Sequence, residues 1–162
     1  TFYVEAGKKA LEKLGLEVDV LEISQMSKSD VSDRLERNDM VYISGGNTFF
    51  LLQELKKKGA DVKIPELIDR GIVYIGESAG SAILSPDVSY MKGLDNPIEA
   101  PELTSFEGLN VIDVYPLPHH TNYPFKRAVE QVLADNPELN LLPFSNKQAI
   151  CVTGSEVQLR EK

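Results

Sequence analysis

The 162-residue chain has one cysteine, two histidines and no tryptophan. A single cysteine cannot form a disulfide within the chain, and Cys151 lies in the apolar run QAICV, which predicts a buried thiol in a strand. The histidines are adjacent, as His119 and His120, and no Cys–His spacing typical of a zinc site is present. We therefore predict that the protein uses no metal and no cofactor.

Long apolar runs and an excess of basic residues are also missing. No segment approaches the roughly 18 apolar residues that a membrane helix requires, and no secretory signal is visible. Acidic residues outnumber basic ones, 25 to 17, for a net charge of −8. This charge disfavours binding to nucleic acid and to anionic membranes. We expect a cytoplasmic protein that binds neither, and whose one macromolecular partner would be a second copy in a homodimer.

The length is that of a single domain covering residues 1–162. Apolar periodicity predicts helices over residues 2–14, 30–37, 48–58, 64–70, 78–84 and 123–135. Alternating or continuous apolar runs predict strands over residues 16–23, 40–44, 72–76, 109–117, 139–144, 148–152 and 156–160. Alternation of the two predicts an α/β fold with a mostly parallel sheet and helices on both faces. Because such a sheet normally has a strand before its first helix, we expect an N-terminal strand before Thr1.

A serine between two glycines, Gly76-Glu77-Ser78-Ala79-Gly80, joins the predicted strand 72–76 to the helix after it. We expect a turn so sharp that side chains at both glycines would collide with neighbouring backbone. Such a turn lifts the serine hydroxyl above the carboxyl end of the strand, where a helix N-terminus favours negative charge. The context favours Ser78 as a nucleophile; the alternative is an ordinary helix cap.

Paired glycines follow the preceding strand, in Ser44-Gly45-Gly46-Asn47-Thr48. Without side chains, their N–H groups can face a cavity and hold an oxyanion. The alternative is a tight connection in which Asn47 or Thr48 caps the next helix, and both descriptions can hold together. This turn and the serine turn fall at the carboxyl edge of the sheet, where open α/β sheets bind ligands.

A base for the serine must come from the two histidines in LPHHTNYP, which follow the predicted strand 109–117 and so fall at the same edge. A neutral imidazole can take the serine proton. Spacing alone does not distinguish His119 from His120.

With GGNTFFLL, GESAGSAIL and PHHTN in this order, the chain resembles the peptidase E family over nearly its whole length. That family consists of serine peptidases with the class I glutamine amidotransferase-like fold, of flavodoxin-like layering, and includes aspartyl dipeptidases and the more distant cyanophycinases. The resemblance implies Ser78 as nucleophile, His119 as base with His120 at a variable position, and the N–H groups of Gly46 and Ala79 as the oxyanion hole.

The chain departs from the family at the acid of the triad. The late glutamate of the aspartyl dipeptidases aligns with Asn146, which is not a carboxylate. A second family acid matches Asp95 after a two-residue insertion, and Asp95 either orients His119 or braces the long segment 85–108. The family's basic loop is shortened here to YPFKR, so aspartyl specificity does not carry over.

The resemblance implies hydrolysis of short peptides through an acyl-enzyme on Ser78, by a dipeptidase or an exopeptidase with either a triad or a Ser–His dyad. Loss of the late carboxylate leaves a second hypothesis, a catalytically degenerate binding or regulatory protein. Glutamine amidotransfer is disfavoured, because that chemistry uses a cysteine at the position of Ser78.

Overall fold

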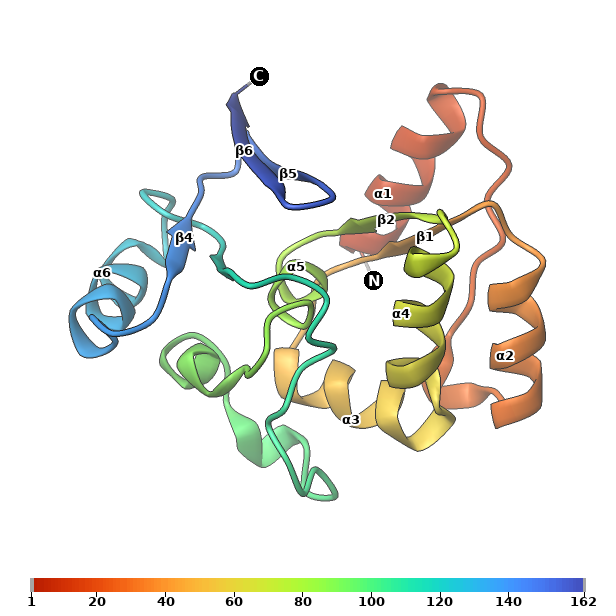
Figure 1. Ribbon diagram of the computed structural model, residues 1–162, viewed down its shortest axis with the longest axis horizontal. Helices are drawn as coiled ribbons and strands as arrows, with labels where there is room; N and C mark the ends of the chain where they lie inside the picture. The colour runs from red at the N-terminus through yellow and green to blue at the C-terminus, as the bar shows by residue number, and fades with distance from the viewer. Residues whose placement is uncertain (1, 162) are drawn as a thin grey trace.

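Six α-helices and three pairs of strands make up the computed structural model, which describes residues 2–161 (Figure 1). The helices are α1 (Phe2–Lys13), α2 (Lys28–Glu36), α3 (Thr48–Lys58), α4 (Ala60–Asp69), α5 (Ala79–Ala82) and α6 (Lys126–Asp135). The strands are β1 (Met40–Ile43), β2 (Val73–Gly76), β3 (Tyr115–Leu117), β4 (Leu141–Pro143), β5 (Gln148–Thr153) and β6 (Glu156–Glu161). Short 3₁₀ helices are η1 (Ile23–Gln25), η2 (Ser89–Gly93) and η3 (Pro97–Glu99). The predicted α/β class is confirmed.

Two of the strand pairs are parallel. β1 pairs with β2 from Met40↔Val73 to Ile43↔Gly76, and β3 pairs with β4, whereas β5 and β6 form an antiparallel hairpin. The predicted strand 109–117 forms only at its end, because residues 109–111 donate backbone hydrogen bonds to carbonyls of residues 83–85. Within residues 2–161, the strands therefore form three two-stranded ladders rather than one continuous sheet.

The strand predicted over residues 16–23 is wrong. Alternation of apolar and acidic residues describes only the two faces of a strand, and a strand also needs a neighbour for its N–H and C=O groups. Side chains of α2 bind this segment instead. Arg34 Nε donates to Asp19 Oδ2 over 3.0 Å, and Arg34 Nη2 donates to the Val20 carbonyl over 3.0 Å.

Helix ends follow their capping residues closely. Asn47 Oδ1 accepts from two N–H groups of the first turn of α3, both over 3.0 Å, and Gly59 ends that helix with φ of 71°. α4 begins directly after this glycine, at Ala60, so Pro65 lies inside it rather than at the predicted start. Ser27 caps α2, and its Oγ accepts from the N–H of Asp30, the third residue of the helix.

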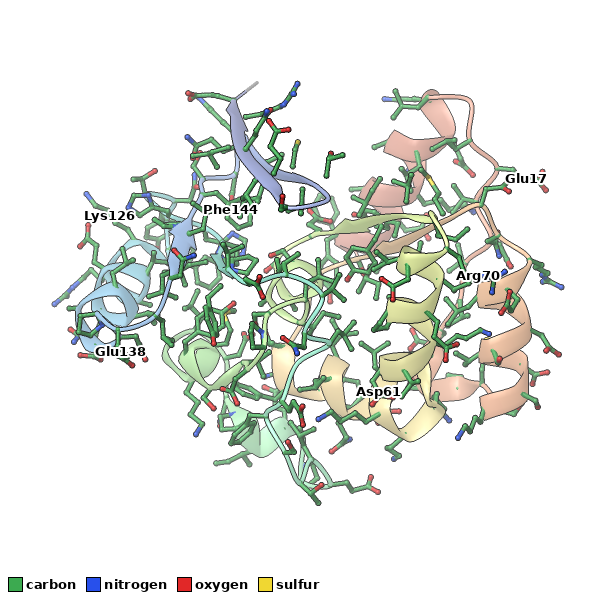
Figure 2. The ribbon with its side chains drawn as sticks, viewed as in Figure 1. Glu17, Asp61, Arg70, Lys126, Glu138 and Phe144 are labelled. Atoms are coloured by element: carbon green, nitrogen blue, oxygen red, sulfur yellow. The ribbon has the colours of Figure 1, made fainter. Side chains whose placement is uncertain are left out.

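The buried core lies between α3, α4, α5, η2 and α6. Its largest fully buried side chains include Phe49, Leu52, Ile64, Ile83, Met91, Leu117 and Val129. Phe49 packs edge-on against Phe106 of the long segment 85–108, with ring centroids 5.3 Å apart. These contacts fix the start of α3 and the segment after α5, which both border the site described below. Figure 2 shows the side chains on the ribbon.

The β5–β6 hairpin extends away from the helices and carries the C-terminal end of the chain (Figure 1). Cys151 on β5 is exposed, which corrects the predicted buried thiol. An apolar strand is buried only when another layer covers it, and Val157 and Leu159 on β6 remain 39% and 45% exposed. No helix among residues 2–161 is long and apolar enough to cross a membrane.

Candidate active site

Ser78 lies on a strained turn between β2 and α5. Its backbone has φ of 52° and ψ of −112°, a conformation that residues with a side chain rarely adopt. A Cβ atom at Gly76 would lie 2.3 Å from the Gly80 carbonyl oxygen, and one at Gly80 would lie 2.5 Å from the Ile43 carbonyl oxygen. The predicted steric need for both glycines is therefore confirmed.

His119 lies just beyond β3 and faces this serine. Ser78 Oγ and His119 Nε2 are 2.8 Å apart, within hydrogen-bond distance. The imidazole stacks on Phe125, with centroids 4.7 Å apart and planes inclined by 25°, and this contact restricts its rotation. The backbone of His120 instead joins the neighbouring loop, donating to the Phe144 carbonyl over 3.0 Å. Phe144 follows β4 and is labelled in Figure 2.

The other imidazole nitrogen faces Asn146. His119 Nδ1 and Asn146 Oδ1 are 2.9 Å apart. Because an amide oxygen only accepts, Nδ1 carries the proton and Nε2 is left free to accept from the serine hydroxyl. Asn122 braces the pair: its Oδ1 accepts from the Asn146 N–H over 2.8 Å, and its own N–H donates to the His119 carbonyl over 3.0 Å. The loops after β3 and β4 thus hold the imidazole in the orientation and tautomer that a base requires.

Asp95 has different hydrogen-bond partners. Its Oδ2 accepts from the Thr48 N–H over 2.9 Å and from Thr48 Oγ1 over 2.6 Å, at the first turn of α3. Beside it, the Asn47 side chain donates to the Asn96 carbonyl over 2.9 Å. Among the described residues, the structure groups Ser78, His119 and Asn146 and places the Asp95 carboxylate on Thr48. This geometry matches the bracing alternative for Asp95.

The two glycine-containing turns meet at the serine. A Cβ atom at Gly45 would lie 3.2 Å from Ser78 Cβ, a tight contact that shows how closely the two turns approach. Gly46 has φ of 141° and lines the same cavity as Ser78. Ala79 is the first residue of α5, so its N–H has no acceptor within the helix. Of the two predicted oxyanion donors, Gly46 thus lies in the turn that approaches Ser78, and Ala79 directly follows Ser78 in the chain.

A cavity of about 290 Å³ opens over these groups. It is lined by Tyr3, Gly45, Gly46, Glu77, Ser78, Met91, Leu94, Asp95, His119 and Phe125. Sequence reasoning did not identify the contributions of Tyr3, Met91, Leu94 and Phe125, which come from distant segments and carry no local signal. Glu77 could have been identified, because it immediately precedes the serine.

Glu77 accepts a hydrogen bond from the hydroxyl of Tyr42, on the neighbouring strand β1. Burial, and then this carboxylate, raise the pKa of the Tyr42 phenol well above its ordinary value. The phenol therefore remains a donor over the physiological pH range. In the part of the chain that the structure describes, no three His, Cys, Asp or Glu side chains are grouped to hold a metal ion.

Comparison with known proteins gives one consistent family. Residues 1–160 match the model of peptidase family S51. An uncharacterized peptidase of Listeria innocua is 50% identical over 157 residues, covering 96% of this chain and 75% of that protein. Peptidase E of Shigella flexneri is 28% identical over 165 residues, covering 97% of this chain and 69% of that protein. A crystal structure from Listeria monocytogenes EGD-e, of a protein assigned to peptidase E, superposes with a TM-score of 0.95 and 46% identity, covering 100% of this chain and 79% of that one.

Proposed function

Because the chain belongs to peptidase family S51, as its resemblance to the peptidase E family predicted, we propose that it hydrolyses short peptides through an acyl-enzyme on Ser78. The observation that carries the proposal is the series Ser78 Oγ, His119 imidazole and Asn146 Oδ1, joined over 2.8 and 2.9 Å. This series provides a nucleophile, a base in hydrogen-bond contact with it, and a group that fixes the base, the arrangement expected of an activated serine.

In the proposed reaction, His119 Nε2 takes the Ser78 proton as Oγ attacks the substrate carbonyl. The oxyanion forms between the N–H groups of Gly46 and Ala79, and one such donor typically changes turnover by roughly 10²–10³. The imidazolium then protonates the leaving amine, and an activated water hydrolyses the ester on Ser78.

Asn146 takes the place of the triad acid in this scheme. Its amide oxygen keeps His119 in the productive tautomer but supplies no negative charge to stabilise the imidazolium. We expect a Ser–His pair oriented by a neutral amide, with turnover below that of a Ser–His–Asp triad. Asp95 takes no part in the proton transfer.

The experiment is labelling with a fluorophosphonate, which reacts with activated serines. We expect an adduct on the peptide that contains Ser78, lost in Ser78→Ala and in His119→Ala. Ser29→Ala, at an exposed serine on α2, is the matched control and should label like the unmodified protein. Labelling that persists in Ser78→Ala would overturn the assignment of the nucleophile.

A second candidate function is a catalytically degenerate binding or regulatory protein. The observation that favours it is the amide of Asn146 at the position of the acid. Absence of an adduct on Ser78 after prolonged exposure, in protein with an intact thermal transition, would support this function over the peptidase.

The proposal extends to the whole chain. We propose a single hydrolytic domain with the layering of class I glutamine amidotransferases, supported by the parallel β1–β2 pair and by helices α3 and α5 that follow its strands. The cavity volume of about 290 Å³ supports a short peptide as substrate, and hence dipeptidase or exopeptidase action. A cytoplasmic location and a homodimer remain predictions from the sequence.

A further inference from the structure

The cavity over Ser78 carries negative charge. Of its lining residues, Glu77 and Asp95 are acidic, and none of those within residues 2–161 is Lys or Arg. His119 adds no charge when it acts as a base. A substrate carboxylate placed here would meet two like charges, whereas a cationic group would be attracted.

The two carboxylates are not equally available to a ligand. Asp95 is half-buried and bonded twice to Thr48. Glu77 is exposed and uses one oxygen, Oε2, to accept from Tyr42. An ionised carboxylate accepts through both oxygens, so Glu77, which also lines the cavity, has a second oxygen with which to accept from a ligand.

Tyr42 holds this carboxylate from β1. Its hydroxyl lies close to α1, since a Cβ atom at Gly7 would come within 2.6 Å of Tyr42 Oη. The phenol thus lies between α1 and the Ser78 turn and restricts the rotation of Glu77. A carboxylate held in one orientation loses less conformational freedom when it binds a ligand.

Resting on the proposed function, we propose that Glu77 is a specificity-determining residue that selects peptides with an ammonium group beside the scissile carbonyl. Glu77 and Ser78 are consecutive and line the same cavity, which would bring a group bound there by Glu77 near the carbonyl that Ser78 attacks. The free α-ammonium of a peptide fits this position, as does the side chain of a lysine. Met91, Leu94 and Phe125 form the apolar part of the cavity wall.

The test compares four peptides by the rate of alanine release: Leu-Ala, N-acetyl-Leu-Ala, N-acetyl-Lys-Ala and Asp-Ala. A preference for Leu-Ala over N-acetyl-Leu-Ala identifies the α-ammonium as the selected group. A preference for N-acetyl-Lys-Ala over N-acetyl-Leu-Ala identifies the lysine side chain. Asp-Ala should be a poorer substrate than Leu-Ala. Equal kcat/KM for Leu-Ala, N-acetyl-Lys-Ala and N-acetyl-Leu-Ala overturns the proposal without any variant.

Glu77→Gln removes the charge but keeps the size and an acceptor for Tyr42. It should lower kcat/KM for the preferred ammonium peptide by roughly tenfold or more, mainly through KM, as expected for loss of a charge-assisted hydrogen bond. The ratio of kcat/KM for the ammonium peptide to that for N-acetyl-Leu-Ala should fall with it, because the acetylated leucine peptide has no ammonium group for Glu77 to bind. Tyr42→Phe distinguishes the charge of Glu77 from its structural role, because it removes the hydrogen bond to Glu77 and leaves the carboxylate charge.

Glu99→Gln is the matched control, since Glu99 is an exposed glutamate on η3 outside the cavity lining. If Glu77→Gln behaves like Glu99→Gln on every peptide, the selection by Glu77 is refuted while the peptidase function stands. Binding of Leu-Ala and of N-acetyl-Lys-Ala to Ser78→Ala, with and without Glu77→Gln, gives a readout that needs no turnover. If Ser78 takes no fluorophosphonate and no peptide is cleaved, the proposed function fails and this inference fails with it.

Discussion

At the scale of single residues, the proposed mechanism depends on the contact between His119 and Asn146. Asn146 already reaches the imidazole at 2.9 Å, so aspartate, which has the same shape, is the carboxylate that keeps this contact. Asn146→Asp should raise kcat by roughly tenfold or more, because acid and amide differ by roughly 10⁴-fold in the Ser–His–Asp template. Asn146→Ala, which removes the orienting oxygen, should lower kcat. Steady-state kinetics of both variants test this, and an Asn146→Asp enzyme no faster than the parent contradicts it.

Asp95 has a structural role at α3 and no role in the proposed proton transfer. Its carboxylate bonds to the first turn of α3 through Thr48, so Asp95→Asn should destabilise the fold by about 1–2 kcal/mol, as for loss of a helix-capping acceptor. The kcat for a cleaved peptide should stay near the parent value. Denaturant unfolding and steady-state kinetics separate the two effects. A large fall in kcat at unchanged stability would instead assign Asp95 to the proton transfer.

At the scale of elements, a cluster of charges joins the end of α2 to α4. The Glu36 carboxylate accepts from Arg70 over 2.9 and 3.0 Å and pairs with Lys63. Figure 2 shows Arg70 at the end of α4, towards α2. The guanidinium of Arg70, and then the Lys63 ammonium, lower the pKa of Glu36 to about 2 from an ordinary value of 4.5.

This lowered pKa makes a prediction about stability and pH. Glu36 stabilises the folded state fully above pH 4.5, and its contribution is lost as the pH falls towards 2. Glu36→Gln should therefore lower the Tm at neutral pH by a small amount that shrinks with added salt, because Glu36 and Arg70 are exposed. It should also flatten the fall of Tm below pH 4.5. Thermal unfolding at several pH values tests this, with Glu99→Gln as control. Identical pH profiles of Tm for the two variants would contradict the stabilising role of Glu36.

At the scale of the whole molecule, the candidate site is assembled from segments far apart in the chain. Tyr3 comes from α1, Gly45 and Gly46 from the end of β1, Ser78 from the end of β2, and His119 from the end of β3. The residues proposed for catalysis thus each follow a strand, and the core contacts of α3 and α5 hold the turns in place. The exposed β5–β6 hairpin contributes no residue to the cavity lining.

Local sequence alone determined the features that depend on a few consecutive residues. The ends of α3 follow from Asn47 and Gly59, since a capping oxygen and a left-handed glycine act within one turn. The serine turn follows from Gly76 and Gly80, because the steric conflict lies within the same five residues and the adjacent strand. The resemblance to the peptidase E family, in addition, predicted Asn146 at the position of the family's acid.

The tertiary structure decided what depends on distant partners. Asn146 meets His119 because β3 and β4 pair in one register, and no local pattern encodes that distance. The pairing of Glu77 with Tyr42 likewise needs β1 beside β2. Within residues 2–161, residues 16–23 have the alternation of a strand but no neighbour to pair with, and Cys151 has an apolar context but no covering layer. Periodicity specifies the faces of a segment, whereas burial and hydrogen bonding depend on what the rest of the chain brings against them.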